Sequence, residues 1–379
     1  MSRSEPLPLF TVFALHVIQY QAPLHAELAQ RDDLHLHVVF FSDKGASPYF
    51  DAGFGRRVQW DIDLLAGYEH SLLPQSWLKR LLAVITQVRR SDVILVHGHS
   101  APWMLITTLV AILTRRPYLL RGDSWVEGMA TGWRKLLRQV VVRGVVGPSA
   151  AGLANGIRNA DFYRSFGCRN VVMAPYSVDV ERFRSGTEEA RSGRESRLRG
   201  LGLDPSLPTI VSAAKLVPVK RPHDLVAALK WMKCRANLVF VGDEELAQAV
   251  AAAARGQRVA MMGFVNQSNM PAALALGDVH ALVSEVEPWG LVVNEAMACG
   301  LLPVVSDRVG CAPDLVEGVG ETFPVGDVKA LAAALDRAVQ RLSDDDWRRE
   351  GARRLDCRGV RATAAGFAWA ASHAIAKAS

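Results

Sequence analysis

The chain has 379 residues, 50% of them hydrophobic, with 44 Lys and Arg against 38 Asp and Glu. This composition excludes disordered, collagen-like and small disulfide-stapled chains. At about 100–200 residues per domain, the length predicts two domains, each able to bury a core. The positive excess is uneven, since residues 1–180 hold 19 basic and 14 acidic side chains and the rest hold 25 and 24. A basic half is compatible with a phosphate-bearing ligand, an anionic membrane surface or no charged partner.

The cysteines and the apolar runs indicate a cytoplasmic protein. The five cysteines are far apart and form no C-x-x-C pair, which argues against a disulfide framework or a zinc site. The longest apolar stretch, Trp103–Leu113, is shorter than the roughly 20 residues that cross a bilayer. The early apolar stretch Leu7–Leu15 runs into His16 without a small-residue cleavage site, so we expect a first strand and no signal peptide.

Short apolar runs separated by longer amphipathic stretches predict parallel strands with crossover helices. The first half contains six such runs, at Phe10–Leu15, Leu36–Phe41, Val93–Val96, Tyr118–Leu120, Gly152–Ala154 and Val171–Ala174. The second half contains six more, at Thr209–Ser212, Asn237–Val241, Arg258–Met262, Val279–Val283, Leu302–Val305 and Glu321–Phe323. Between the halves, the charged stretch Arg182–Pro205 indicates a linker with a surface helix. We therefore expect two doubly wound α/β domains that bind ligands beyond the carboxyl ends of their strands, in a cleft between the halves.

The stretch Ala281–Asp307 has the pattern strand, loop, helix, glycine, strand. Gly290 marks the turn into a helix over Leu291–Ala298, and Gly300 is suited to end it. The amides around Gly290, Leu291 and Val292 would then form an anion site at a helix N-terminus. Glu287 and Glu295 flank this site, and a carboxylate can accept two hydrogen bonds from a vicinal diol.

This run resembles the E-x7-E signature of the family 4 glycosyltransferases, which are retaining enzymes of the two-domain GT-B architecture. Val211–Leu229 resembles the segment in which an Arg and a Lys, five residues apart, clamp the donor diphosphate. Here those positions hold Lys215 and Lys220, and Lys for Arg loses the planar bidentate fork. The resemblance implies transfer of a sugar from a nucleotide-diphosphate sugar to an acceptor hydroxyl, with retention and without a metal or other cofactor.

Two further segments resemble the same family in the expected order. In Leu238–Leu246, Gly242 and Asp243 indicate a turn and a helix N-cap more than a ligand contact. In Met262–Val279, the resemblance places Gly263, Phe264 and Val265 at the border of the nucleobase. Stacking on the base and plain core packing both remain open for Phe264.

The first half resembles the family more loosely. Ser91–Pro102 matches the strand end at which the family places a histidine beside the donor sugar, and that residue is His97. The family's Gly-rich first loop is replaced by His16–Leu28, which contains no glycine and puts Gln19 and Tyr20 there. Arg121 and Asp123, at the end of another strand, are further candidates for the acceptor side. The pairs His35/His37 and His97/His99 lack a third ligand nearby in sequence, so no metal site is expected.

The resemblance assigns a role to each candidate. Glu295 binds the ribose, Glu287 the donor sugar, and His97 orients the sugar near its anomeric centre. The catalytic candidates are His97, Glu287 and Lys220; the donor-binding candidates are Lys215, Lys220, Gly263, Phe264, Val265, Glu287, Gly290, Leu291, Val292 and Glu295. The expected divisions are an acceptor-side domain at 1–182, a linker at 183–206, a nucleotide-sugar domain at 207–343 and helices at 344–379 that return to the first domain.

Several alternatives remain open at this stage. The acceptor is a carbohydrate, a lipid-linked compound or a small molecule, in polysaccharide, glycolipid or other glycoconjugate biosynthesis, and no nucleic-acid partner is expected. Ser76–Arg90 and Gly132–Gly144 are basic and amphipathic, which is typical of helices flanking a sheet and also of a peripheral membrane surface, here at the inner membrane face. A nucleotide-sugar 2-epimerase and a non-catalytic nucleotide-binding module share the architecture and are the competing functions.

Overall fold

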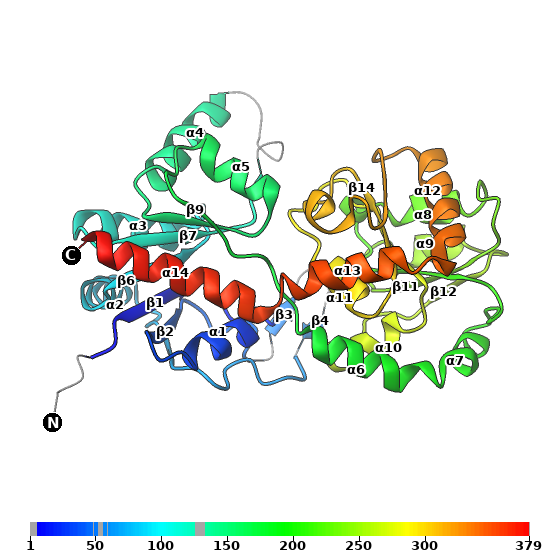
Figure 1. Cartoon of the computed structure of the whole chain (residues 1–379), viewed down its shortest axis with the longest axis horizontal. Helices are drawn as coiled ribbons and strands as arrows, with labels where there is room; N and C mark the ends of the chain where they lie inside the picture. The colour runs from blue at the N-terminus through cyan, green and yellow to red at the C-terminus, as the bar shows by residue number, and fades with distance from the viewer. Residues whose placement is uncertain (1–5, 48, 52–55, 59, 126–132, 379) are drawn as a thin grey trace. The chain divides into compact units, whose positions relative to one another are not determined.

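The computed structural model describes residues 6–47, 49–51, 56–58, 60–125 and 133–378 (Figure 1). Their contacts group into two compact units. The first comprises the chain up to Tyr49, then Asp63–Ser177 and the stretch from Val360, and the second comprises Phe50–Ile62 and Val178–Gly359. The first unit thus ends at Ser177, where the sequence suggested residue 182, and the chain re-enters it at Val360, where the sequence suggested residue 344.

The first unit is built on a seven-stranded parallel sheet in the order β5-β2-β1-β6-β7-β8-β9. The strands are β1 Leu9–Ala14, β2 His35–Phe40, β5 His70–Leu72, β6 Val93–His97, β7 Tyr118–Arg121, β8 Ala151–Ala154 and β9 Val171–Met173. The helices are α1 Ala22–Ala29, α2 Trp77–Arg90, α3 Pro102–Leu113, α4 Trp133–Val146, α5 Ile157–Ser165 and α14 Val360–Ala378. Figure 1 shows α14, in red, alongside the first sheet, where it contacts α1 and strands β6 to β9.

The second unit has a six-stranded parallel sheet in the order β12-β11-β10-β13-β14-β15. Its strands are β10 Thr209–Ala213, β11 Asn237–Val241, β12 Val259–Met261, β13 Val279–Leu282, β14 Leu302–Ser306 and β15 Glu321–Phe323. Its α-helices are α6 Val180–Arg191, α7 Arg194–Gly200, α8 Pro222–Ala228, α9 Ala247–Ala253, α10 Met270–Leu274, α11 Leu291–Ala298, α12 Val328–Gln340 and α13 Asp346–Asp356. Short helical turns complete it: η2 Pro218–Lys220, η3 Gln267–Asn269, η4 Ala312–Val316 and η5 Arg341–Ser343.

All twelve predicted strands are present, and the prediction of two parallel α/β domains is confirmed. The sequence missed β5, whose three residues His-Ser-Leu are partly or fully exposed at the sheet edge and form no apolar run. It also missed the small pair β3 Tyr49–Asp51 and β4 Arg56–Val58. Interior strands covered on both faces need continuous apolar side chains, and an edge strand does not.

The expected linker is folded into the second unit. Residues 182–205 contain most of α6 and all of α7, and Phe183 and Leu198 are buried there. The α6 helix packs against α10 and α11, and Arg194 donates to the Asp278 carboxylate at 2.6 Å. A narrow apolar stripe among many charges is enough to dock a helix on its neighbouring helices.

Each sheet reverses its winding direction at one point. In the first sheet this point lies between β1 and β6, where Phe13 pairs with Val96. In the second it lies between β10 and β13, where Val211 pairs with His280. Loops that leave the carboxyl ends of two such strands diverge to opposite faces and leave room for a ligand. His97 is the last residue of β6, and the loops after β10 and β13 carry Lys215, Lys220 and Glu287.

Within the described ranges, none of the helices has the length and apolar content needed to cross a bilayer.

Candidate functional site

The loops after β10 and β13 in the second unit bring two of the predicted site residues into contact. Lys220 ends the turn η2, and the adjacent Val219 carbonyl accepts the Glu285 amide at 2.7 Å, which fixes one loop to the other. The Lys220 ammonium forms an ion pair with the Glu287 carboxylate, and both side chains are largely buried. These two residues are 67 positions apart in sequence and form one ion pair between β10 and β13, where the sheet reverses its winding direction.

The helix α11 begins beside this ion pair. Gly290 has φ +91°, in the left-handed region, and a Cβ there would lie 2.9 Å from a Leu282 methyl group. Among the described residues, no side chain forms a capping hydrogen bond at the start of the helix. The first amides of a helix have no acceptor within it, so Leu291 and Val292 supply donors at its positive end. Gly300, with φ +78°, follows the last turn as the sequence predicted.

Buried contacts hold the loop before α11 in place. The Trp289 indole donates to the Asn294 side chain at 3.0 Å, and the Glu287 carbonyl accepts the Gly310 amide at 2.8 Å. Gly310 approaches so closely that a Cβ would lie 1.8 Å from the Pro288 carbonyl oxygen. The position of Glu287 is thus set by the backbone on both sides, as an anion or sugar site requires.

Lys215 lies in the loop just after β10, and its ammonium is 3.9 Å from a Glu244 carboxylate oxygen. Glu244 has φ +109° and a buried side chain. The loops meet because Gly242 has no side chain: a Cβ would lie 2.0 Å from the Ala214 carbonyl oxygen. Gly242 forms an isolated β-bridge with Gly263, and the expected turn lies after it, at residues 245–246. Asp243 is not a helix N-cap, because α9 begins at Ala247 after Leu246.

The nucleobase-side candidates follow β12. Gly263, with φ +68°, accepts the Gly242 amide at 2.8 Å, and Phe264 and Val265 come next with partly buried side chains. Glu295 lies on α11, and its side chain is partly exposed while its carboxyl group is buried enough to raise its pKa to about 7. The nearby Arg182 guanidinium opposes that pKa rise. A carboxyl group with this pKa is present in both forms near neutrality.

In the first unit, His97 ends β6 at the switch point. Its Nδ1 lies 3.4 Å from the Gln21 side-chain amide, and its Nε2 has no hydrogen-bond partner among the described residues. Burial, together with Arg121 and His25, holds the pKa of His97 well below its ordinary value. The ring is therefore neutral at pH 7, and with Gln21 donating to Nδ1, its Nε2–H is a donor for a ligand oxygen.

The four acceptor-side candidates differ in exposure. The Arg121 guanidinium is buried, donates to the Ala174 and Pro175 carbonyls at 2.6 and 3.3 Å, and lies over the rings of Tyr176 and Phe367. These contacts join β7 to α14, which is an internal structural role. Tyr20 packs edge-on against Tyr176 with ring centroids 5.3 Å apart, and burial raises its pKa. Gln19 is partly exposed and Asp123 exposed.

Sequence reasoning missed several residues around these positions. Tyr176 follows a predicted strand at its carboxyl end, and that placement was a usable signal. Glu244 and Arg182 gave no signal, since their roles depend on backbone contacts between loops and helices distant in sequence. In the described part of the chain, no group of three or more His, Cys, Asp or Glu residues is placed to hold a metal ion.

Several known proteins similar to this chain are named as glycosyltransferases. Residues 194–354 match the family model described as glycosyl transferases group 1. A GDP-mannose-dependent alpha-(1-6)-phosphatidylinositol monomannoside mannosyltransferase of Mycobacterium tuberculosis is 30% identical over 280 residues, covering 68% of this chain and 71% of that protein. A 2-deoxystreptamine N-acetyl-D-glucosaminyltransferase of Streptomyces fradiae is 30% identical over 291 residues, covering 70% and 68%. An N-acetyl-alpha-D-glucosaminyl L-malate synthase of Bacillus anthracis is 33% identical over 39% of each chain.

The fold is shared with solved structures. The Anabaena protein HepE in complex with UDP matches with a TM-score of 0.72 and 17% identity, covering 97% of this chain and 100% of that one. This likeness agrees with the GT-B fold expected from the sequence. The relatives named above are transferases and synthases, and they give the epimerase alternative no support. The chain belongs to the group 1 glycosyl transferases.

Proposed function

We propose that this glycosyltransferase moves a sugar from a nucleotide-diphosphate sugar to an acceptor hydroxyl with retention of configuration. The bond between the anomeric carbon and the diphosphate oxygen breaks, and the electron pair leaves with the diphosphate. The acceptor oxygen forms the new bond on the same face, and its proton passes to the departing diphosphate. The largest demand on the protein is to stabilise the departing charge, which fixed positive groups do best.

The Lys220–Glu287 ion pair beside the N-terminus of α11 is the observation that carries this proposal. A cation, a carboxylate and free helix amides within one loop cluster match a ligand with a diphosphate and adjacent hydroxyl groups. In this assignment Lys215, Lys220 and the amides of Leu291 and Val292 bind the diphosphate, and Glu287 binds the sugar. Glu295 binds the ribose, Phe264 borders the base, and the neutral His97 donates Nε2–H to the sugar. No metal is assigned to the reaction.

The relatives guide the choice of donors and acceptors for a test. One relative is named for GDP-mannose and one solved neighbour holds UDP, so a thermal-shift panel begins with GDP and UDP sugars and adds ADP sugars. A donor present at about 100 times its dissociation constant adds about 2.7 kcal/mol of apparent stability. The named acceptors, a phosphatidylinositol mannoside and 2-deoxystreptamine, differ widely, so lipid-linked and small-molecule acceptors are both assayed.

The test of the site uses matched pairs of variants. Lys220→Ala and Glu287→Gln should each lower kcat/KM by about a hundredfold or more, whereas the exposed Lys230→Ala and Glu317→Gln should leave it unchanged. Proton NMR of the product reports its anomeric configuration, and an inverted product would exclude retention. Donor binding without transfer to any acceptor would favour the non-catalytic module, and product formed from donor alone would favour the epimerase.

We also propose peripheral membrane contact through α2. Only Val84 and Val88 of this helix are buried, whereas Trp77, Leu78 and Leu82 are 61%, 61% and 55% exposed. Four cations share the helix: Lys79, Arg80, Arg89 and Arg90. Exposed large apolar side chains among bases are typical of helices that lie in an anionic membrane surface.

Liposome co-sedimentation tests the membrane contact. Binding to anionic vesicles should fall in a Trp77→Ser, Leu78→Ser double variant and persist in Trp231→Ser, a similarly exposed Trp of the second unit. Equal absence of binding to anionic and neutral vesicles by the unaltered protein would exclude the contact.

A further inference from the structure

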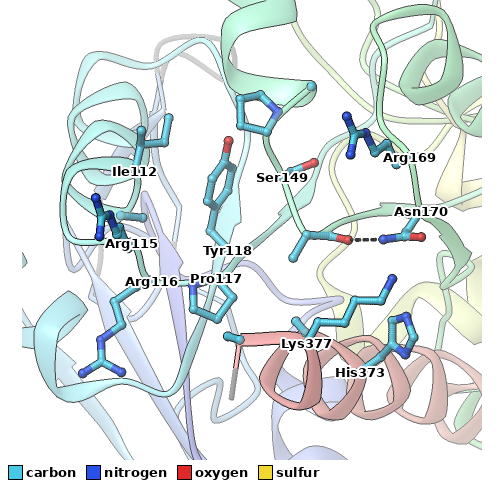
Figure 2. A pocket seen from close by; sticks show the side chains of 16 residues that line it. Ile112, Arg115, Arg116, Pro117, Tyr118, Ser149, Arg169, Asn170, His373 and Lys377 are labelled. Carbon is cyan, nitrogen blue, oxygen red and sulfur yellow. Dashed lines mark hydrogen bonds between the residues drawn. The ribbon is translucent and has the colours of Figure 1, made fainter.

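A pocket of about 560 Å³ lies in the first unit at the amino ends of β7, β8 and β9 (Figure 2). Its walls are the end of α3 with the loop that follows, the loops 147–150 and 169–170, and the last turns of α14. His97 and Arg121 are the last residues of β6 and β7, so they lie at the carboxyl ends of the strands, opposite to the pocket. The pocket is therefore separate from the residues assigned above to sugar transfer.

Positive charge dominates this pocket. Arg115, Arg116, Arg169 and Lys377 line it, and none of its sixteen lining residues is Asp or Glu. Figure 2 shows the two consecutive arginines on one side and Arg169 and Lys377 on the other. Across the described ranges these four side chains form no ion pair; Arg116 donates to the Arg89 carbonyl at 2.8 Å. Positive charges that line one pocket without an acidic residue among the lining residues repel each other, and an anion bound in the pocket reduces that cost.

The negative ends of the helix dipoles near the pocket balance only part of the positive charge of these four side chains. Helices α3, α4, α5 and α14 end at this edge, and each C-terminus carries about half a negative charge, roughly −2 in total. The four cations exceed this by about +2. Neutral donors already serve some of the helix-end carbonyls, since Tyr118 donates to Val145 at 2.7 Å and Ser149 to Val146 at 2.6 Å.

The backbone at Arg115 gives a second, independent indication. The helix α3 ends with Arg116 donating its amide to Ala111 and Arg115 donating to Ile112, at 2.9 and 3.2 Å. Arg115 has φ +54°, the left-handed conformation that glycine normally supplies after a helix. A residue with a side chain is strained there, and such strain is found where the side chain has a task.

We infer that this pocket binds an anionic phosphate group, either a phosphomonoester of charge about −2 or the more highly charged pyrophosphate, at a site separate from sugar transfer. The volume falls within the 300–1,000 Å³ typical of ligand pockets, so the phosphate can be attached to a larger group. Two sources offer this chemistry: a water-soluble phosphate ester and the headgroup of an anionic phospholipid. The exposed Ile112, on the pocket wall, and Leu113, next to it in sequence, would face lipid in the second case.

The test combines titration calorimetry and vesicle sedimentation on the full chain. The probes are inorganic pyrophosphate and phosphatidylcholine vesicles with and without phosphatidic acid. The variants are Arg115→Gly and Arg169→Gln, and Arg164→Gln is the control, an exposed arginine of the same unit that lies outside both the pocket and α2. Arg115→Gly removes a cation and relieves the backbone strain, so its melting temperature should equal or exceed that of the unaltered protein. Reduced binding by this variant then has no explanation in misfolding.

Pyrophosphate should bind the unaltered protein at a class of site that both pocket variants weaken at least fivefold and that Arg164→Gln preserves. A hydrogen bond to a charged group is worth about that much even when it is screened. This outcome supports the soluble source. Loss of binding to phosphatidic acid vesicles in the pocket variants alone supports the lipid source. If pyrophosphate and vesicles bind all four proteins alike, or bind none, the inference is wrong. None of these readouts depends on transferase activity, so the outcome is independent of the proposed reaction.

Discussion

Replacing Glu295 by Gln should raise the stability of the protein and lower its affinity for the nucleotide. Burial raises the pKa of the Glu295 carboxyl group from 4.5 to about 7, so the folded chain holds a proton there that the unfolded chain has released. Between these two pKa values the unfolded state binds fewer protons, and stability must fall as pH rises. The penalty is absent below about pH 4.5 and complete above about pH 7. Glu295→Gln removes it and keeps the shape of the side chain.

The size of the effect follows from the pKa change. A rise from 4.5 to about 7 corresponds to roughly 3 kcal/mol, and partial exposure of the side chain reduces this to about 2 kcal/mol. For a domain of this size, that is an increase of about 4–8 °C in melting temperature at pH 8, with little change at pH 4.5. Scanning calorimetry at several pH values measures it, and the exposed Glu317→Gln serves as control.

Nucleotide binding should change in the other direction. If the carboxylate accepts hydrogen bonds from the ribose, Glu295→Gln lowers donor affinity by about tenfold or more. A variant that is more stable and binds nucleotide less tightly shows that the chain retains a costly buried carboxyl group for binding. Equal stability of the two proteins at pH 8 and pH 4.5 would refute the desolvated carboxyl, and unchanged nucleotide affinity would refute the ribose assignment.

Three further substitutions should change stability, one through lost hydrogen bonds, one through backbone conformation and one through a buried ionisable group. Arg121→Met leaves the Ala174 and Pro175 carbonyls without their donor and should lower the free energy of unfolding by about 3 kcal/mol in urea titration; an unchanged midpoint would deny its structural role. Gly290→Ala puts a Cβ at φ +91° and 2.9 Å from Leu282 and should cost about 1–2 kcal/mol and weaken donor-induced thermal shifts; full retention of both would show that the loop adapts. Burial lowers the pKa of His280 to about 3, so stability is lost as pH falls below 6.5. His280→Leu should therefore remove about 3 kcal/mol of acid destabilisation at pH 4, and parallel pH–stability curves would contradict this.

The sheets were predictable from sequence because their strands are buried on both faces. Ile210, Val211 and Leu238 are fully buried, and parallel interior strands leave such continuous apolar runs. The site was predictable to the extent that it lies at strand ends. Lys220 and Glu287 follow β10 and β13, and topology alone brings those loops together.

What could not be predicted depends on contacts that no local pattern encodes. The pairing of Lys215 with Glu244 requires Gly242 to approach the Ala214 carbonyl, which depends on how two loops meet. The docking of residues 182–205 rests on a few buried side chains among many charges. Arg121 looked like a ligand residue because it ends a strand, yet α14, more than 200 residues later, supplies Phe367 to cover it.

The two groups of cations differ in their partners, and this difference predicts their order of affinity for a bare anion. Lys215 and Lys220 each face a carboxylate, so pyrophosphate must displace Glu244 or Glu287 before it can use either charge. In the proposed assignment, a nucleotide-sugar offers hydroxyl groups to Glu287 in exchange, and that would free Lys220 for the diphosphate. At the amino ends of the strands in the first sheet, Arg169 and the other pocket cations have no acidic residue among the residues that line the pocket. Pyrophosphate should therefore bind more tightly to the class of site removed by Arg169→Gln than to the class removed by Lys220→Ala. If Lys220→Ala instead removes the tighter class of site, the carboxylates do not weaken the binding of pyrophosphate by the lysines. Lys220 would then bind the anion even when no sugar occupies Glu287.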